Sequence, residues 1–293
     1  MTESPAEPTV VEFIEKLART AAQIRDPVLR RYFIVLRLLD QADPLVVEFL
    51  HEVQNRALRG DLAAQSVVAA GLDAQLLADE FGHDRVGRLF HEANRKKYSE
   101  VCNLFRTLRP AKTPDGDEDA FYRYGLVNST VGERTSAARS TDADVLNRVG
   151  YDVDPRVIRQ LLQNPRLTEQ MVVVITARRP NRPAVLTEIY HSMKWRSRAE
   201  VRVALVRNPY TPPQIAMALL PTLKKQELAA VLGDGKVHRE VRLAAETALQ
   251  KKKEGLKKKA AAEPAAPAEP ANAAPAPAAN VIFLDRKKKS PLD

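Results

Sequence analysis

Two stretches decide the fold: DPRVIRQLLQNPRLTEQ at residues 154–170 and AEVRVALVRNPYTPPQIAMALL at residues 199–220. In each, apolar residues at helical spacing run into an Asn-Pro pair, and the two pairs stand 44 residues apart. Proline cannot continue a helix and disfavours the helical conformation in the residue before it, so each stretch predicts a helix, a stop and a second helix. Thr211 and Pro212 then indicate a helix cap and a first helical position.

Weaker copies of this pattern flank the two stretches, at residues 137–146 and 241–244. Helical units that contact only their neighbours stack into an α-solenoid. We therefore expect a helical repeat domain over residues 121–250. The whole chain predicts an all-α protein, because Leu, Val and Ala dominate its 44% of hydrophobic residues, whereas aromatic residues make up only 5%.

The two quoted stretches resemble leucine-rich repeat variant units and, more broadly, HEAT-like repeats, over roughly residues 134–250. The resemblance implies a right-handed stack of short helices. Some variant-repeat proteins also hold an iron–sulfur cluster on an N-terminal group of cysteines, but Cys102 is the only cysteine here. We therefore carry over no cofactor, and a single cysteine also excludes a disulfide framework.

Residues 9–110 predict a helical domain of no family that we can name. Asp26-Pro27 and Asp43-Pro44 each indicate a helix start, because aspartate accepts hydrogen bonds from free N–H groups and proline fits the first helical position. Further expected boundaries are a capping box at Thr9 and Glu12, caps at Asp61 and Asp73, and a turn at Phe81-Gly82-His83. One long amphipathic segment is expected from about Asp84 to Leu108.

The remaining segments are expected to be connections. Residues 1–8 are predicted to be disordered, and the polar residues 111–120 a linker between the two domains. The aromatics of Phe121–Gly125, just after that linker, are expected to pack one domain on the other. Residues 251–280, rich in Lys and then in Ala and Pro, predict a disordered linker before a short C-terminal motif at 281–293.

Positive charge is concentrated in the expected repeat domain. Residues 148–207 carry twelve Lys and Arg against five Asp and Glu, within a chain of net charge +9. Equivalent positions of successive repeats line one surface, so these arginines predict a stripe that binds phosphates or an acidic protein surface. The simpler alternative is a solvated face with local ion pairs. The candidate contacts are Arg156, Arg159, Arg178, Arg179, Arg182, Arg196, Arg198, Arg202 and Arg207.

The motif at residues 281–293 is a second candidate contact. Four adjacent apolar residues are costly to leave in water at the end of a polar linker, so the motif is expected to dock on a sheet edge or in a groove of a partner. It could equally fold back onto this chain. The candidate residues are Val281, Ile282, Phe283, Leu284 and Arg286.

Several classes of protein find no support in the sequence. No apolar run reaches the ~20 residues of a membrane span, and the first residues differ from a signal peptide, so a cytoplasmic location is expected. Phosphate loops, nucleophile elbows and zinc helix motifs are missing, so no catalytic residue is assigned. No metal site is assigned to the group Glu80, His83, Asp84, His91 and Glu92, because the two histidines lie too far apart on one helix.

These patterns favour a non-enzymatic scaffold or adaptor. The repeat array would bind one protein partner, and the C-terminal peptide would recruit a second. The alternative is a nucleic-acid-binding protein that uses the same arginines, and the two can be separated by salt because phosphate binding releases counterions. The oligomeric state stays open at this point.

Overall fold

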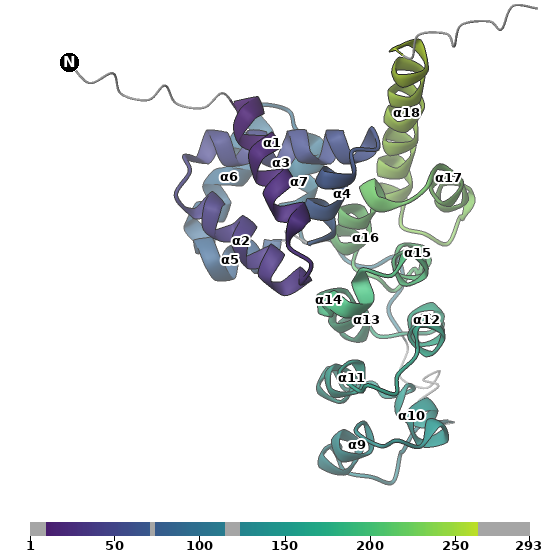
Figure 1. The fold of residues 1–293 in the computed structure, drawn as a ribbon. Helices are drawn as coiled ribbons and strands as arrows, with labels where there is room; N and C mark the ends of the chain where they lie inside the picture. Colours follow the sequence, from purple (N-terminus) through teal and green to yellow (C-terminus); the bar gives the residue numbers. More distant parts are fainter. Residues whose placement is uncertain (1–9, 71–73, 115–123, 263–293) are drawn as a thin grey trace, which may run out of the picture.

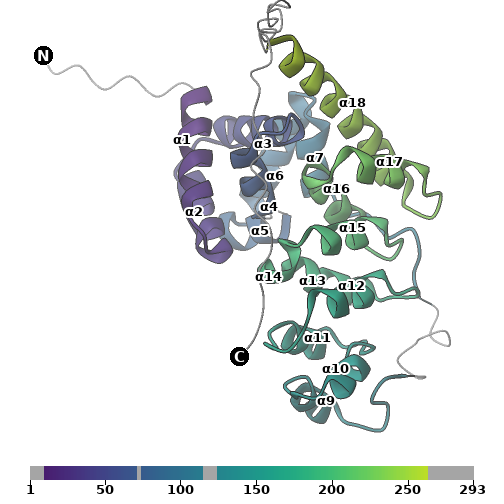
Figure 2. The same ribbon diagram turned by 45° about the vertical axis from the view of Figure 1, so that its right-hand side comes forward.

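The computed structural model describes residues 10–70, 74–114 and 124–262, and within these ranges every regular element is helical (Figures 1 and 2). The prediction of an all-α protein is therefore confirmed. Two groups of helices can be distinguished, each with its own cluster of buried apolar side chains. We call them the N-terminal bundle, residues 10–105, and the repeat array, residues 124–262.

The N-terminal bundle consists of helices that pack around α3. Its core contains Ile14, Ile34, Phe49, Leu50 and Leu89, all nearly inaccessible to solvent. The helices are α1 (Val10–Gln23), α2 (Pro27–Leu39), α3 (Asp43–Leu58), α4 (Leu62–Ala69), α5 (Ala74–Phe81), α6 (His83–Arg95) and α7 (Ser99–Phe105).

The predicted helix starts near Asp26, Asp43 and Asp61 are confirmed within one residue, and two of these three aspartates cap their helices as expected. Asp26 accepts hydrogen bonds from Val28 N and Leu29 N, and Asp61 caps α4 in the same way. Only the capping role predicted for Asp43 is wrong, because α3 begins at Asp43 itself and Ala42 occupies the cap position. The Asp43 carboxylate instead pairs with Arg85 and Arg88 of α6 at 2.8 and 2.9 Å. Thr9 and Asp73 lie outside the described residues.

The long amphipathic segment predicted over 84–108 is not one helix. α6 ends at Arg95 and α7 begins at Ser99, with Lys97 at a φ of 59° between them. The break turns the Tyr98 hydroxyl toward Glu48 of α3, to which it donates a hydrogen bond at 3.1 Å. The expected turn at Gly82 is confirmed, with a φ of 81° between α5 and α6.

The repeat array alternates between two columns of short helices. Figure 1 shows α9, α11 and α13 stacked in one column and α10, α12, α15 and α17 in the other. The helices are α9 (Val131–Ala137), α10 (Ala143–Val149), α11 (Pro155–Leu162), α12 (Glu169–Ala177), α13 (Pro183–His191), α14 (Met193–Arg196), α15 (Ala199–Arg207), α16 (Pro213–Leu219), α17 (Lys225–Gly233) and α18 (Arg239–Ala262). A 3-10 helix, η2 (Leu220–Thr222), follows α16.

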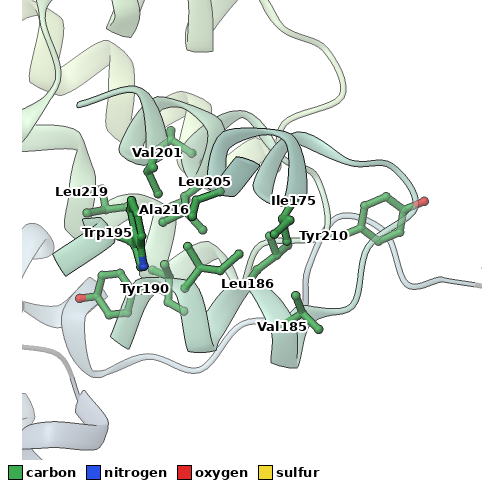
Figure 3. Close-up of a cluster of buried hydrophobic side chains, with 14 of the residues drawn as sticks. Ile175, Val185, Leu186, Tyr190, Trp195, Val201, Leu205, Tyr210, Ala216 and Leu219 are labelled. Atoms are coloured by element: carbon green, nitrogen blue, oxygen red, sulfur yellow. The ribbon is translucent and has the colours of Figure 1, made fainter. Parts of the chain in front are cut away.

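The core of the array lies between the two columns. Figure 3 shows Leu186 of α13 and Leu205 of α15 pointing into it, together with Tyr190 and Trp195. Trp195 is 2% exposed, and its indole N–H donates to Leu162 O at 2.8 Å, so the polar atom of this large side chain is satisfied at the end of α11.

The two Asn-Pro asparagines have the same structural role. Asn164 Nδ2 donates to Ala138 O and Ser140 O, at the end of α9. Asn208 Nδ2 donates to Thr176 O and Arg178 O, at the end of α12. Each amide therefore ties its helix end to the end of the preceding helix in the same column. However, α13 and α14 stand between the two matching hairpins, so the 44-residue interval contains more than one helix pair.

The predicted start of the helix after Asn208 is displaced. α16 begins at Pro213, and Pro212 occupies its cap position. Thr211 is 2% exposed and caps nothing, because its hydroxyl is turned into the protein.

The N-terminal bundle packs against the later part of the array. α7 contacts α16, and α3 contacts α18. A buried polar connection is made by Arg196 of α14, which is 0% exposed and donates to Ala69 O and Ala70 O at the end of α4. The two predicted domains therefore share an extensive interface, which nothing in the repeat pattern indicates.

The last helix is longer than expected. α18 runs twelve residues past position 250, so the Lys-rich linker does not begin at residue 251. Lys251 explains part of the extension, because its ammonium group lies 3.5 Å from Glu100 Oε1 and donates to Asn55 Oδ1 at 2.8 Å. Residues 263–280 lie outside the described part of the chain.

Glu100 is the centre of a polar network between α3, α7 and α18. The ammonium group of Lys251 can only donate, so the Asn55 atom that faces it is the oxygen Oδ1. The amide nitrogen Nδ2 of Asn55 therefore faces His51 Nε2, 3.0 Å away. His51 Nε2 then accepts, and Nδ1 of the ring lies 2.7 Å from Glu100 Oε1. Burial acts to raise the pKa of Glu100, but the contacts with His51 and Lys251 outweigh it and lower the pKa to about 2.

We expect Glu100→Gln to lower the free energy of unfolding at pH 7 by about 2–3 kcal/mol. The folded-state pKa lies below the ordinary value of 4.5, so this stabilisation is present above about pH 4.5 and is lost as the pH falls toward 2. Urea unfolding from pH 7 to pH 2.5 checks this, with exposed Glu246→Gln as the control. A difference between Glu100→Gln and wild type that persists undiminished at pH 2.5 would contradict the assignment.

Candidate interaction surface of the repeat array

The nine predicted arginines do not form one stripe. Four are exposed and pair with carboxylates of the array: Arg156 with Asp154 at 2.7 Å, Arg159 with Glu188 at 2.6 Å, Arg198 with Glu169 at 3.7 Å, and Arg207 with Asp234 at 3.6 Å. Exposed pairs of this kind contribute at most about 1 kcal/mol each. They nevertheless balance locally much of the positive charge that the sequence concentrates here.

Three further arginines hold helix ends. Arg178 Nη1 donates to Gly150 O at 2.7 Å, Arg179 Nη2 to Arg207 O at 2.6 Å, and Arg202 Nη1 to Ser197 O at 2.6 Å. The last carbonyls of a helix have no partner within the helix, so these side chains satisfy them. Burial lowers the pKa of Arg202, in keeping with a structural position.

Arg196 is not a surface residue, which corrects the sequence-based prediction. Besides its contacts with α4, its Nη1 donates to Tyr190 O at 3.2 Å, and its guanidinium lies 4.8 Å from the centre of the Tyr190 ring. It is buried because the N-terminal bundle covers α14, a contact that spacing within the repeats cannot reveal. Arg182 is half-buried immediately before α13.

The arginines outside the interior are divided between two edges of the array. Arg178 and Arg179 lie in the loop that follows α12. Arg178 donates to Gly150 O after α10, and the Arg178 carbonyl accepts from Asn208 Nδ2 after α15, so these three loops lie on one edge. Arg198 directly precedes α15 and pairs with Glu169, the first residue of α12. Both residues therefore lie at the opposite ends of these helices. Arg178 and Arg179 thus lie on a different edge from Arg198. Val281, Ile282, Phe283, Leu284 and Arg286 lie outside the described residues.

A different surface of the array has the form of a binding site. Between α10 and α12 lies an open cavity of about 550 Å³, within the size range of small-ligand and peptide side-chain pockets. We call it the α10–α12 groove. It is lined by Leu146, Asn147, Gly150, Tyr151, Gln170, Met171, Val174, Ile175 and Arg178. Val174, one of these lining residues, is 55% exposed.

Tyr151 forms one side of this groove. Its ring lies 5.1 Å from the ring of Tyr124 and 5.2 Å from the guanidinium of Arg178, measured between centres. Tyr124 was expected to pack one domain on the other, but it contacts the array itself and is 56% exposed. The Tyr151 ring is held between the Tyr124 ring and the Arg178 guanidinium, so it loses little conformational entropy when a ligand binds. This restriction favours an apolar contact at Tyr151.

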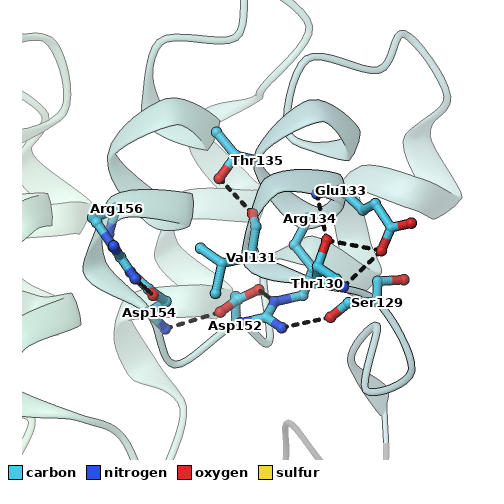
Figure 4. A network of polar contacts seen from close by, with 9 residues as sticks. All are labelled: Ser129, Thr130, Val131, Glu133, Arg134, Thr135, Asp152, Asp154 and Arg156. Atoms are coloured by element: carbon cyan, nitrogen blue, oxygen red, sulfur yellow. Dashed lines mark hydrogen bonds and ion pairs between the residues drawn. The ribbon is translucent and has the colours of Figure 1, made fainter.

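The loop that carries Tyr151 is held by the polar network in Figure 4. Asp152 is 1% exposed and pairs with Arg134 of α9 at 2.7 Å, and its second oxygen accepts from Asp154 N. Arg134 also donates to Ser129 O, and Asp154 caps α11. The network therefore fixes α9, α11 and this loop relative to one another, and gives the groove a preformed wall.

Gly150 explains how α10 and α12 approach each other at the floor of the groove. A Cβ at this position would lie 3.1 Å from Asn147 O and 3.1 Å from a side-chain carbon of Ile175. The groove itself was missed by the sequence-based analysis. The sequence does contain a signal for an exposed apolar surface here, because Val172-Val173-Val174-Ile175 places four adjacent apolar residues in one helix. A helix with one buried face must expose part of such a run.

Other kinds of site receive no support from the residues described. Among them, no three His, Cys, Asp or Glu side chains gather as a metal site would require. In the same ranges, no helix combines the length and apolar character needed to cross a membrane. Comparison with family models, with curated proteins and with solved structures finds no match to this chain.

Proposed function

We propose that this chain is a non-enzymatic scaffold whose repeat array binds a protein partner in the α10–α12 groove. The observation that carries the proposal is the open apolar cavity of about 550 Å³ with exposed Val174 at its rim. A cavity of this volume accommodates one or two large apolar side chains of a peptide. Its preformed wall supports binding without a large ordering cost.

The charge around the groove indicates the chemistry of the partner. Arg178 lines the groove, and exposed Arg148 in α10 follows Asn147, another lining residue. Arg148 has no ion pair with any residue in the described ranges. A peptide with an apolar anchor and an acidic residue close to it would suit this surface. The peptide at residues 281–286 remains a proposed second contact, for a different partner.

The nucleic-acid alternative has weaker support. A phosphate backbone needs cations in a continuous row, whereas the arginines here divide between two edges, four carboxylate pairs and one buried position. No aromatic row accompanies them along either edge of the described array. We therefore treat strong, salt-sensitive nucleic-acid binding as an outcome that would replace the proposal.

A peptide selection tests the proposed site. We expect phage-displayed peptides selected on the full chain to share a large apolar residue. Their affinity should fall at least tenfold with Val174→Glu, because the substitution turns a carboxylate into the apolar groove. Leu62→Glu is the matched control, since Leu62 is 77% exposed on α4 in the other group of helices.

A further inference from the structure

Helix α2 presents an apolar face to solvent. Leu29, Tyr32 and Leu36 are 62%, 55% and 56% exposed, and spacings of three and four residues place them on one face. The other side of the helix is different, since Ile34 and Leu38 are buried in the core of the bundle. Figure 2 shows α2 beside α1 on the outer side of the bundle, although α2 also contacts α14 of the array.

Charged residues of opposite sign flank α2 in the sequence. Arg25 precedes the cap of α2, and Asp40 is its C-terminal cap. Both are exposed, and neither forms an ion pair with another residue in the described part of the chain. Asp40 follows Leu36 by four residues and so continues the same helical face.

We propose that α2 packs antiparallel against α2 of a second copy of this chain, about a two-fold axis between Tyr32 and Phe33. In that arrangement Leu29 faces the partner's Leu36, and Arg25 faces the partner's Asp40. Symmetry repeats both contacts. A parallel arrangement would instead oppose Arg25 to the partner's Arg25, so the charges select the antiparallel one.

The match between the two halves of the face argues for a second copy rather than another partner. The sequence positions of Leu29 and Leu36, and those of Arg25 and Asp40, are symmetric about the point between residues 32 and 33, so an identical antiparallel helix offers each of them its counterpart. α2 has 13 residues and is about 20 Å long, so the contact is smaller than the ~800 Å² per partner of a stable interface. The dimer is therefore expected to be concentration-dependent.

Sedimentation of the full chain over a wide concentration range tests the proposal. We expect the mass to rise from the 32.6 kDa of one chain toward twice that value. Leu36→Asp should abolish the rise without unfolding the protein, because the side chain is already half exposed. Leu243→Asp, at a 48% exposed leucine of α18, should leave it unchanged. A dimer that tolerates Leu36→Asp overturns the proposal.

Charge exchange identifies the pairing itself. Arg25→Asp and Asp40→Arg alone should each weaken the dimer about three- to tenfold, and the double variant should restore it. A double variant as weak as either single one overturns the antiparallel pairing. A full chain that stays monomeric at every concentration also overturns the proposal. If the chain shortened at residue 262 then dimerises through Leu36, residues 263–293 cover this face instead.

Discussion

Replacing Arg196 with alanine is expected to lower the free energy of unfolding by about 3–5 kcal/mol. The guanidinium is fully buried and donates to three carbonyls, those of Ala69, Ala70 and Tyr190. Alanine leaves these acceptors buried without a donor, and it also opens a cavity at the contact between the bundle and the array. Urea unfolding measures the loss.

Two further variants separate this role from ordinary charge removal. Arg196→Lys keeps the charge but has a single nitrogen, which cannot reach all three carbonyls, so we expect an intermediate loss. Arg198→Ala is the matched control, because its side chain is 54% exposed and its pair with Glu169 spans 3.7 Å. If Arg196→Ala costs no more than Arg198→Ala, Arg196 does not hold the two groups of helices together.

Asn208→Ala is expected to cost about 2–4 kcal/mol of stability, the second largest effect. Its Nδ2 donates to Thr176 O at 2.6 Å and to Arg178 O at 3.0 Å, and its Oδ1 accepts from Tyr210 N. Asn94→Ala on α6 is the control, since that side chain is exposed. Equal unfolding midpoints for the two variants would contradict the role assigned to Asn208.

Asn208→Asp adds a test by pH. A carboxylate would face two carbonyl oxygens, so its pKa in the folded state should be raised above the ordinary value of ~3.9. A group with a raised folded-state pKa contributes its stability at low pH and loses it as the pH rises through that pKa. The deficit of Asn208→Asp relative to wild type should therefore be smallest in acid, when the protonated carboxyl can donate.

Local signals in the sequence predicted much of the fold. Asp26 and Asp61 begin helices, Gly82 makes a turn, and the Asn-Pro pairs end α11 and α15. Each of these depends on a side chain or a backbone angle within a few residues. Asp43 looked identical to Asp26, but Arg85 and Arg88, more than forty residues away, compete for its carboxylate.

The prediction that the arginines form one stripe was wrong for a related reason. The sequence shows where arginines are concentrated, but not whether each one pairs with a carboxylate, binds a helix end or is buried. The groups that decide this lie on other helices. Arg196 and Arg198 are two residues apart, yet the first is 0% exposed and the second pairs with Glu169 on the surface. The α10–α12 groove likewise requires two helices at a spacing set by Gly150 and Ile175.

We propose above all that the groove binds a protein segment through apolar contact. The most direct measurement is the fluorescence anisotropy of one selected peptide with the full chain and with Val174→Glu, at low and at high salt. We expect binding that changes little with salt and is lost in Val174→Glu. Binding that is equal in both proteins and falls steeply with salt would contradict it, and would return the function to the arginines and lysines.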